Sequence, residues 1–323
     1  MSEASRLAHV YSVFADQEVA GRSPLYAQIC RGIAGNASFL ERVAALPPEK
    51  QQPNLLLAAV KYLFGVAQDW THFHALIEDN WLAIEAVIQA RRTQTNEPAR
   101  CATLLPLLAQ LPQPLALLEV GASAGLCLLP DKYAYDYGRR RVEPTAPSAD
   151  TPLFHCEAND VTPLPKKNIE VAWRAGLDLS PLSVARDDDR RWLQALVWPG
   201  EGERGILLDK AIAVARRDPP RVVAGDLRHD LTALAATAPG DATLVIFHTA
   251  VLAYVSEASD RRAFAKTVRD LGAQWVSNES ARLFDGPELT ERLGGRFVLT
   301  LNGVPKAYTE AHGTAIDWIA PAA

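Results

Sequence analysis

The feature that most constrains the fold is a change in hydrophobic pattern near Pro114. Before it, apolar residues recur every three to four positions, as on one face of an α-helix. After it, short and nearly continuous apolar runs alternate with helix-like stretches, which is typical of a parallel sheet covered on both faces. We therefore predict an all-helical N-terminal domain or cap over residues 1–113. An α/β domain with a doubly wound, mainly parallel sheet is predicted over residues 114–323.

Capping signals mark the helices of the N-terminal part. Ser23 followed by Pro24 is an N-cap with proline at the first helical position, and Asn36 is predicted to cap the next helix. Further helices are predicted at Asn54–Phe64, Leu76–Arg92 and Ala99–Gln110.

In the C-terminal part, strand candidates are separated mostly by helices. The predicted strands are Leu115–Val120, Ile169–Leu177, Arg221–Ala224, Ala242–Phe247, Gln274–Ser277 and Arg296–Leu301, and the predicted helices are Asp188–Leu196, Arg204–Arg216 and Ser259–Leu271. Residues 139–168 contain several prolines and no helical period, so we predict an irregular insertion or hairpin there.

Charge and cysteine content exclude several classes of protein. With 33 Lys+Arg against 38 Asp+Glu, the formal net charge is −5, which argues against a nucleic-acid backbone or an anionic membrane as the main partner. The N-terminus is polar, and no apolar run is long enough to span a bilayer, so we expect a cytoplasmic protein. The 4 cysteines form no CxxC pair, and His72 and His74 face different sides of a helix, so no metal site is expected.

A loop of small residues follows the first predicted strand. Residues 119–125 read Glu-Val-Gly-Ala-Ser-Ala-Gly and precede Leu126–Leu129, which is predicted to start a helix. Small residues let a ligand approach the backbone, because a Cβ atom would collide with it. The spacing excludes the phosphate-binding P-loop, which needs Gly-Lys-Ser/Thr where this chain has Leu126, Cys127 and Leu128. The dinucleotide pattern GxGxxG is also excluded, because it needs glycine at positions 123 and 126.

The loop fits the pattern acidic-x-Gly-x-small-x-Gly, and in this it resembles class I S-adenosylmethionine-dependent methyltransferases. That resemblance implies a Rossmann-like sheet and S-adenosylmethionine as the cofactor. Gly121, Ser123 and Gly125 would then approach the cofactor, and Glu119 would bind its methionine ammonium group. The alternative is a tight strand–helix turn that binds no ligand.

Later strands also end in polar residues, as expected where a ligand binds at the carboxyl ends of adjacent strands. Asp178 closes the second strand and could accept both ribose hydroxyls of a nucleoside. Asp226, followed by Leu227, closes the third strand at the position that lies by the adenine amine in methyltransferases. Gly125 and Asp178 lie 53 residues apart rather than about 20, so residues 139–168 would have to be an insertion. Each aspartate could also be an ordinary surface residue.

Candidate catalytic residues follow the fourth and fifth strands. His248 stands beside the expected methyl group as a base or an orienting residue, unless it is a buried histidine bonded to the backbone. Tyr254 ends the same segment and is a candidate substrate or lid residue. Asn278 and Glu279 could bind a polar substrate or simply face water.

Two further groups of residues remain open between structural and functional roles. Asn96, Glu97 and Arg100 precede the helix before the first strand and form a candidate lid, although Asn96 is also a good helix N-cap. The alternating tyrosines, at positions 133, 135 and 137, share one face of an extended segment. They could stack on a substrate or pack against the sheet.

Over nearly its full length the chain is similar to a mainly bacterial family of unknown function with a methyltransferase-like domain. The segments that carry this similarity are Gly21–Tyr26, Gln52–Leu55, Gln94–Glu97, Leu117–Leu126, Asp131–Gly138, Gly176–Leu179, Arg191–Pro199, Phe247–Tyr254 and Ser277–Glu279. The similarity supplies no substrate.

Our first hypothesis is an S-adenosylmethionine-dependent methyltransferase that acts on a small-molecule acceptor, with the helical part shaping the substrate site. The alternative is a catalytically inactive adenosyl-ligand-binding or regulatory protein on the same fold. A nicotinamide oxidoreductase is disfavoured by the failed GxGxxG pattern. The sequence indicates neither the acceptor nor the oligomeric state.

Overall fold

The computed structural model describes residues 2–94, 96–283 and 295–320. The chain divides into two compact units, one made of residues 1–95 with 186–206 and the other of residues 96–185 with 207–323. A compact unit is not by itself a domain that folds alone, so the domain boundary near residue 113 stays a prediction.

The first unit is helical. It contains α1 (Glu3–Val13), the π-helix η1 (Phe14–Val19), α2 (Pro24–Ala34), α3 (Ala37–Ala44), η2 (Pro48–Lys50), α4 (Pro53–Phe64), α5 (Trp70–Ala90) and α7 (Asp187–Ala195). Both predicted caps are confirmed: Ser23 Oγ accepts from the Tyr26 N–H at 3.4 Å, and Asn36 Oδ1 accepts from the Phe39 N–H at 3.1 Å. α5 begins before the predicted start at Leu76. Asp69 is its N-cap, because Asp69 Oδ1 accepts a hydrogen bond from the His72 N–H at 2.8 Å.

Helix α7 comes late in the sequence but packs against α4. Its Trp192 is fully buried and donates an indole hydrogen bond to the Arg92 carbonyl at 3.1 Å. Lys61, from α4, donates to the Gln194 and Val197 carbonyls at 2.9 and 2.6 Å and so satisfies the C-terminal end of α7. These contacts explain why residues 186–206 belong to the helical unit.

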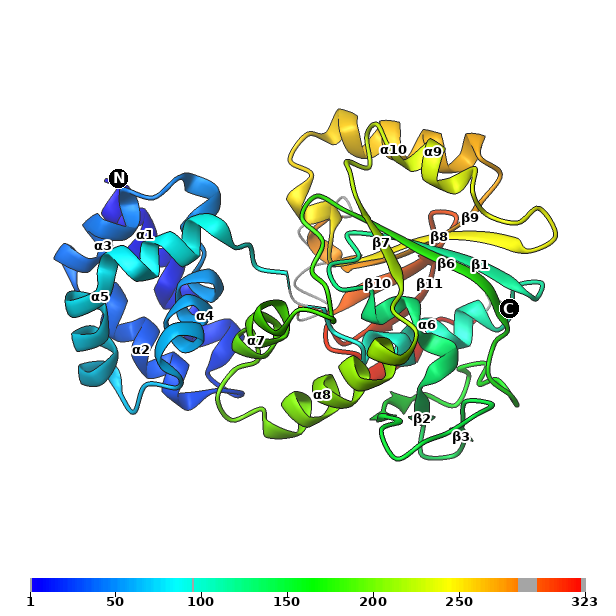
Figure 1. Ribbon diagram of the computed structural model, residues 1–323, viewed down its shortest axis with the longest axis horizontal. Coiled ribbons are helices and arrows are strands. Elements are labelled where there is room, and N and C mark those ends of the chain that lie inside the picture. Colours follow the sequence, from blue (N-terminus) through cyan, green and yellow to red (C-terminus); the bar gives the residue numbers. More distant parts are fainter. Residues whose placement is uncertain (1, 95, 284–294, 321–323) are drawn as a thin grey trace. The chain divides into compact units, whose positions relative to one another are not determined.

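The second unit is built on a mixed α/β plan with a large, mostly parallel central sheet (Figure 1). Its strands are β1 (Leu115–Val120), β5 (Glu157–Ala158), β6 (Val171–Asp178), β7 (Arg221–Ala224), β8 (Thr243–Thr249), β9 (Gln274–Ser280), β10 (Phe297–Leu301), β11 (Val304–Thr309) and β12 (Ala315–Trp318). Within the described residues the order is β5-β12-β11-β10-β9-β8-β1-β6-β7. Strands β7, β6, β1, β8 and β9 run parallel. The pairs β9–β10, β10–β11 and β11–β12 are antiparallel, and β12 pairs in parallel with β5.

The parallel strands form a doubly wound sheet. The chain moves from β1 outward through β6 to β7, then returns to the other side of β1 with β8 and β9. The strand order therefore reverses between β1 and β8, which is where such sheets bind ligands. All the predicted strands are confirmed, with ends that differ by a few residues.

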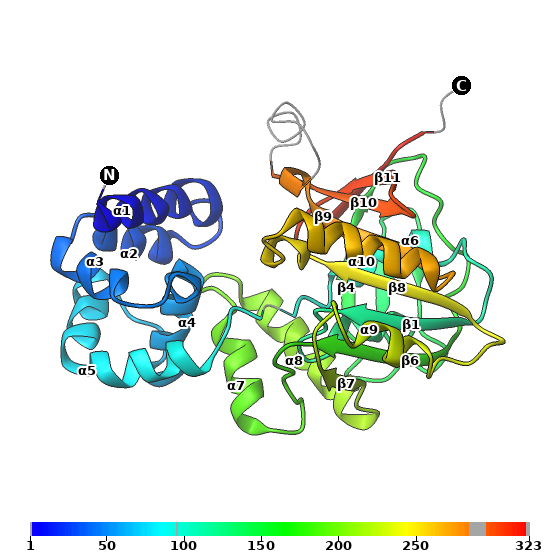
Figure 2. The same cartoon turned by 90° about the horizontal axis from the view of Figure 1, so that it is seen from above.

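Helices cover both faces of this sheet. α9 (Leu231–Ala235) and α10 (Ala258–Asp270) lie on one face, and α6 (Arg100–Leu108) lies on the other (Figures 1 and 2). Leu118 and Val120 of β1 pack with the α9 and α10 side chains. Because successive strand residues point to opposite faces, Glu119 points to the α6 face. The helix α8 (Gly202–Arg217) precedes β7.

The region predicted as an irregular insertion or hairpin contributes two strands to a small sheet, whose third strand lies just before it. This three-stranded sheet has the order β3 (Arg141–Val142), β2 (Ala134–Asp136) and β4 (Leu153–His155). Tyr133, Tyr135 and Tyr137 are buried, and their hydroxyls donate to the carbonyls of Leu126, Pro130 and Ala102. The tyrosines therefore pack inside the unit.

The helix predicted to start at Leu126–Leu129 is wrong. The chain forms only the 3-10 turns η3 (Leu126–Leu128) and η4 (Pro130–Lys132). Proline disfavours helical geometry in the residue before it and lacks an N–H donor, so Pro130 prevents a continuous helix.

Candidate functional site

The candidate site lies at the carboxyl ends of β1, β8 and β9, where the strand order reverses. These ends carry Glu119 from β1, His248 and Thr249 from β8, and Asn278 and Glu279 from β9. Register pairs Thr249 with Asn278 and His248 with Ser277. The polar side chains predicted from separate parts of the sequence therefore meet at one edge of the sheet.

The glycine loop after β1 is shaped by protein contacts. Gly121 and Gly125 have φ angles of +70° and +73°, a region that favours glycine. A Cβ on Gly121 would lie 2.5 Å from Val251 Cγ2, and one on Gly125 would lie 2.7 Å from Pro220 Cγ. Packing against Val251 and Pro220 therefore accounts for both glycines.

Asp178 holds this loop from the end of β6. Its Oδ2 accepts a hydrogen bond from the Ser123 N–H and its Oδ1 accepts one from the Ser180 N–H, each at 2.8 Å. Ser123 itself has a φ of +51°, which is uncommon outside glycine. The carboxylate of Asp178 thus stabilises a backbone turn that would otherwise be unfavourable.

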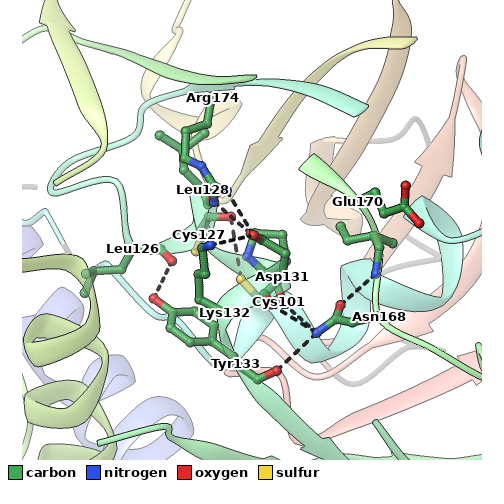
Figure 3. A network of polar contacts seen from close by, with 12 residues as sticks. Cys101, Leu126, Cys127, Leu128, Asp131, Lys132, Tyr133, Asn168, Glu170 and Arg174 are labelled. Carbon is green, nitrogen blue, oxygen red and sulfur yellow. Dashed lines mark hydrogen bonds and ion pairs between the residues drawn. The ribbon is translucent and has the colours of Figure 1, made fainter. Parts of the chain in front are cut away.

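A polar network fixes the segment after the loop (Figure 3). Arg174 of β6 donates to the Leu128 carbonyl and to Asp131 Oδ1, both at 2.7 Å. Asn168 Nδ2 donates to three carbonyls, those of Pro130, Asp131 and Tyr133, at 3.3 to 3.5 Å. Side chains therefore supply the hydrogen bonds that a regular helix would have made internally.

Asn96 and Glu97 contact the same loop segment. Asn96 does not cap α6, since Ala99 occupies that N-cap position; its Oδ1 accepts from the Leu126 N–H at 2.8 Å instead. Glu97 Oε1 accepts from the Ala99 N–H at 3.2 Å, and its Oε2 lies 3.4 Å from His312 Nδ1. Both side chains are buried at the end of β1.

Arg100 reaches the end of β8. Its Nη1 donates to the Thr249 carbonyl at 3.1 Å and to Thr249 Oγ1 at 3.2 Å, while its Nε donates to the Ala311 carbonyl at 2.9 Å. The residue is 7 % exposed. All three acceptors are neutral, and Arg100 forms no ion pair with any described residue.

Glu119 is a buried acid. Burial raises the pKa of its carboxyl well above the ordinary value, and Cys127 and Asp178 act in the same direction while Arg100 opposes them. Within residues 2–94, 96–283 and 295–320, its Oε2 has no hydrogen-bond partner. A buried protein oxygen without a hydrogen bond is costly, so the Glu119 carboxyl is an exception among buried polar groups.

His248 lies on the α10 face between two hydrogen bonds. Nε2 accepts from the Trp275 indole N–H at 3.0 Å, and Nδ1 lies 2.6 Å from Glu279 Oε1. Because an indole nitrogen only donates, the proton of His248 is on Nδ1 and is donated to Glu279. Both ring nitrogens are hydrogen-bonded and the residue is fully buried. In this arrangement neither nitrogen can take a proton from a substrate.

Glu279 is anchored on one oxygen. Besides His248, Oε1 accepts from the Val251 and Leu252 N–H groups at 2.8 and 3.2 Å. Oε2 has no partner in the described part of the chain. Glu279 therefore fixes the backbone that follows β8, including the Val251 that packs on Gly121.

Asn278 is also half satisfied. Its Oδ1 accepts from Thr309 Oγ1 at 2.8 Å, whereas its Nδ2 is buried without a partner among the described residues. The strand alternation places Asn278 on the α6 face, on which Arg100 contacts Thr249.

The remaining predicted residues lie elsewhere or have other partners. Asp226 is bound by Arg228, whose hydrogen bonds lower the pKa of the Asp226 carboxyl to about 2. Leu227 packs on the apolar cluster between the sheet, α9 and α10. Tyr254 ends the short turn η5 (Leu252–Tyr254) and is 65 % exposed.

The sequence reasoning missed Trp275, Thr249, Val251 and Thr309. For Trp275 a signal existed, because alternation within the predicted strand Gln274–Ser277 puts it on the same face as Ser277. The Val251 contact depends on how β8 leaves the sheet, for which no local pattern exists.

None of the described helices combines the length and the apolar character needed to cross a membrane. No curated protein and no solved structure matches this chain. A family model described as "Uncharacterized protein conserved in bacteria (DUF2332)" matches residues 8–318, nearly the whole sequence. The chain therefore belongs to this conserved bacterial family.

Proposed function

We propose that this protein is an S-adenosylmethionine-dependent methyltransferase that acts on a small-molecule acceptor. The observation that carries the proposal is the Glu119 carboxyl, which is buried beside a glycine loop at the reversal point of a doubly wound sheet and has an unpartnered Oε2 among the described residues. Buried polar atoms normally have partners, so a missing partner points to a ligand.

The charges at this edge fit a cationic ligand. Glu119 and Asp178 supply carboxyl groups. Arg100 is the basic side chain that reaches the same strand ends. S-adenosylmethionine carries a sulfonium and an ammonium group, and an ammonium group beside Glu119 would stabilise the ionised carboxylate that burial disfavours.

The chain's own groups would act by positioning. Asp178 holds the Ser123 and Ser180 N–H groups and so would fix the loop beside the ribose of the ligand. Asn96 and Arg100 hold the loop and the end of β8 in fixed places. S-adenosylmethionine supplies the methyl group when bound, and methyl transfer depends mainly on alignment of the reacting atoms.

One observation favours the second candidate, a catalytically inactive adenosyl-ligand-binding or regulatory protein on this fold. Both ring nitrogens of His248, the expected base, are already hydrogen-bonded. An acceptor that must lose a proton would then need another base.

Calorimetry of the full-length protein with S-adenosylmethionine, S-adenosylhomocysteine and NADPH tests the proposal. We expect both adenosyl ligands to bind and NADPH not to bind. Glu119→Gln should weaken binding by about tenfold or more, because a charge-assisted hydrogen bond is lost. Glu170→Gln, the same change at an exposed position before β6, is the matched control and should leave affinity unchanged.

Absence of any adenosyl binding at millimolar concentration by a folded protein would overturn the proposal. If binding occurs, formation of S-adenosylhomocysteine from S-adenosylmethionine separates the two candidates. Turnover supports the enzyme, whereas binding without turnover across an acceptor panel supports the inactive binder.

A further inference from the structure

A nearly buried arginine and an unsatisfied amide come from neighbouring elements on the α6 face of the sheet. Thr249 and Asn278 are register partners on neighbouring parallel strands, so their Cα atoms lie about 4.8 Å apart and their side chains share a face. Arg100 donates to the Thr249 carbonyl and hydroxyl and to the Ala311 carbonyl. The guanidinium therefore contacts Thr249, the register partner of Asn278.

Arg100 is a nearly buried cation that forms no direct ion pair with a described residue, although its charge acts on the Glu119 carboxyl. The acceptors of its hydrogen bonds are two backbone carbonyls and a hydroxyl, all neutral. Burying a charge is unfavourable unless it is paired. The site thus has a positive charge that the described protein groups at hydrogen-bond distance do not neutralise.

Among the described residues, the Asn278 amide is unsatisfied on its donor side. Thr309 Oγ1 donates to Asn278 Oδ1, which leaves Nδ2 as the unsatisfied half of the amide. Nδ2 carries two N–H groups and accepts no hydrogen bonds. A guanidinium and an amide NH₂ together match the oxygens of a carboxylate, which only accept.

We infer that Arg100 and Asn278 bind a carboxylate group of a small-molecule ligand. The carboxylate would pair with Arg100 and accept from Asn278 Nδ2, and it would enter past Arg100, since Asn278 has no exposed surface. This carboxylate belongs either to the acceptor or to the amino-acid part of an adenosyl ligand. The inference shares its sheet edge with the proposed function, and its test below gives a separate answer.

The substitution Asn278→Asp tests the inference, because the inference predicts whether the melting temperature rises or falls. Aspartate keeps an oxygen for the Thr309 hydroxyl and puts a negative charge where the carboxylate would bind. If Arg100 lacks a counter-ion, this variant should melt at a higher temperature than the wild type at pH 7. The gain should disappear in the Arg100→Gln background, because the added charge then has no partner.

Asn168→Asp is the matched control. The Asn168 amide donates to three carbonyls, so the same chemical change there removes needed donors and should lower the melting temperature. If Asn278→Asp lowers it in the same way, Asn278 has an ordinary structural role and the inference is wrong.

Ligand binding gives the second readout. Acetate, benzoate, succinate and S-adenosylhomocysteine are compared with acetamide, benzamide, succinamide and 5′-methylthioadenosine, which lack the carboxylate. At least one carboxylate should stabilise the wild type more than its neutral partner, and Asn278→Asp should abolish the difference. A response confined to S-adenosylhomocysteine identifies the cofactor as the source, and a response to the organic acids identifies the acceptor. If no carboxylate exceeds its neutral partner, the inference fails even where adenosyl ligands bind.

Discussion

Trp275 Nε1 donates to His248 Nε2 across 3.0 Å, and this contact decides which nitrogen of the imidazole carries the proton. The proton is on Nδ1, facing Glu279 Oε1 at 2.6 Å. His248 therefore acts on Glu279, and Glu279 in turn holds the Val251 and Leu252 N–H groups. In this arrangement His248 orients Glu279, and its role toward a substrate, as a base or an orienting residue, stays a prediction.

The first prediction concerns this tautomer. Nitrogen-15 NMR should show His248 Nε2 unprotonated and Nδ1 protonated. Trp275→Phe keeps an aromatic ring but removes the donor, so it should lower the free energy of unfolding by about 1–3 kcal/mol, measured by urea denaturation. Trp318→Phe is the control, because the Trp318 indole has no recorded hydrogen bond to a described residue. Equal losses in the two variants, or a protonated Nε2, would contradict the assignment.

The second prediction concerns Glu119 and pH. Burial raises the pKa of this carboxyl above its ordinary value of 4.5, so the folded state retains a proton that the unfolded state releases as pH rises. The wild type should therefore lose stability as pH increases from about 4.5 toward the folded-state pKa. Glu119→Gln has no such proton. The free energy of unfolding of the variant, relative to that of the wild type, should therefore rise by at most about 1.4 kcal/mol per pH unit. Thermal melts of both proteins across this pH range check it, and a constant difference would refute it.

The third prediction concerns the contact between Gly121 and Val251. Gly121→Ala should destabilise the fold in two ways, through its positive φ and through the clash of the new Cβ with Val251. Gly138→Ala is the matched control, because its φ is +76° but nothing lies within 4 Å of its Cβ position. We expect the control to lose about 1–2 kcal/mol in the free energy of unfolding. Gly121→Ala should lose about 1–3 kcal/mol more. Adding Val251→Ala should recover part of that excess, and no recovery would mean that the clash is not the cause.

The fourth prediction concerns Asp226 and Arg228. The Arg228 hydrogen bonds lower the pKa of Asp226 from 3.8 to about 2, so this pair stabilises the fold above pH 3.8 and loses its contribution as pH falls through about 2. The contribution of a surface pair is about 1 kcal/mol or less. Arg228→Gln should return the Asp226 pKa toward 3.8, measured by carboxyl carbon NMR. An unchanged titration would show that another group lowers it.

Much of the fold follows from local sequence signals. The parallel strands are apolar along most of their length, and the caps at Ser23 and Asn36 act within one helical turn. The helix expected at Leu126–Leu129 fails for a reason that is also local, because Pro130 excludes it. Strands β11 and β12 were missed because their exposed and buried residues do not form a continuous apolar run.

The candidate site was predicted as a set of residues but not as a set of contacts. Strand ends brought Glu119, His248 and Asn278 to one edge, as expected from parallel topology. Two of these contacts depend on the register between different strands. Trp275 donates to His248 Nε2, and Thr309 Oγ1 donates to Asn278 Oδ1. Single-residue patterns contain no information on such register.

The position of α7 has a consequence for how the chain is made. Proteins are synthesised from the N-terminus, and early domains usually fold first. Here the helical unit includes residues 186–206. Helix α4 therefore lacks its partner α7 until strands β1 to β6 of the second unit have been translated. A ribosome-bound chain that stops after residue 95 would therefore carry an incomplete helical unit, and a gene fragment ending there would encode a protein with that apolar surface of α4 uncovered.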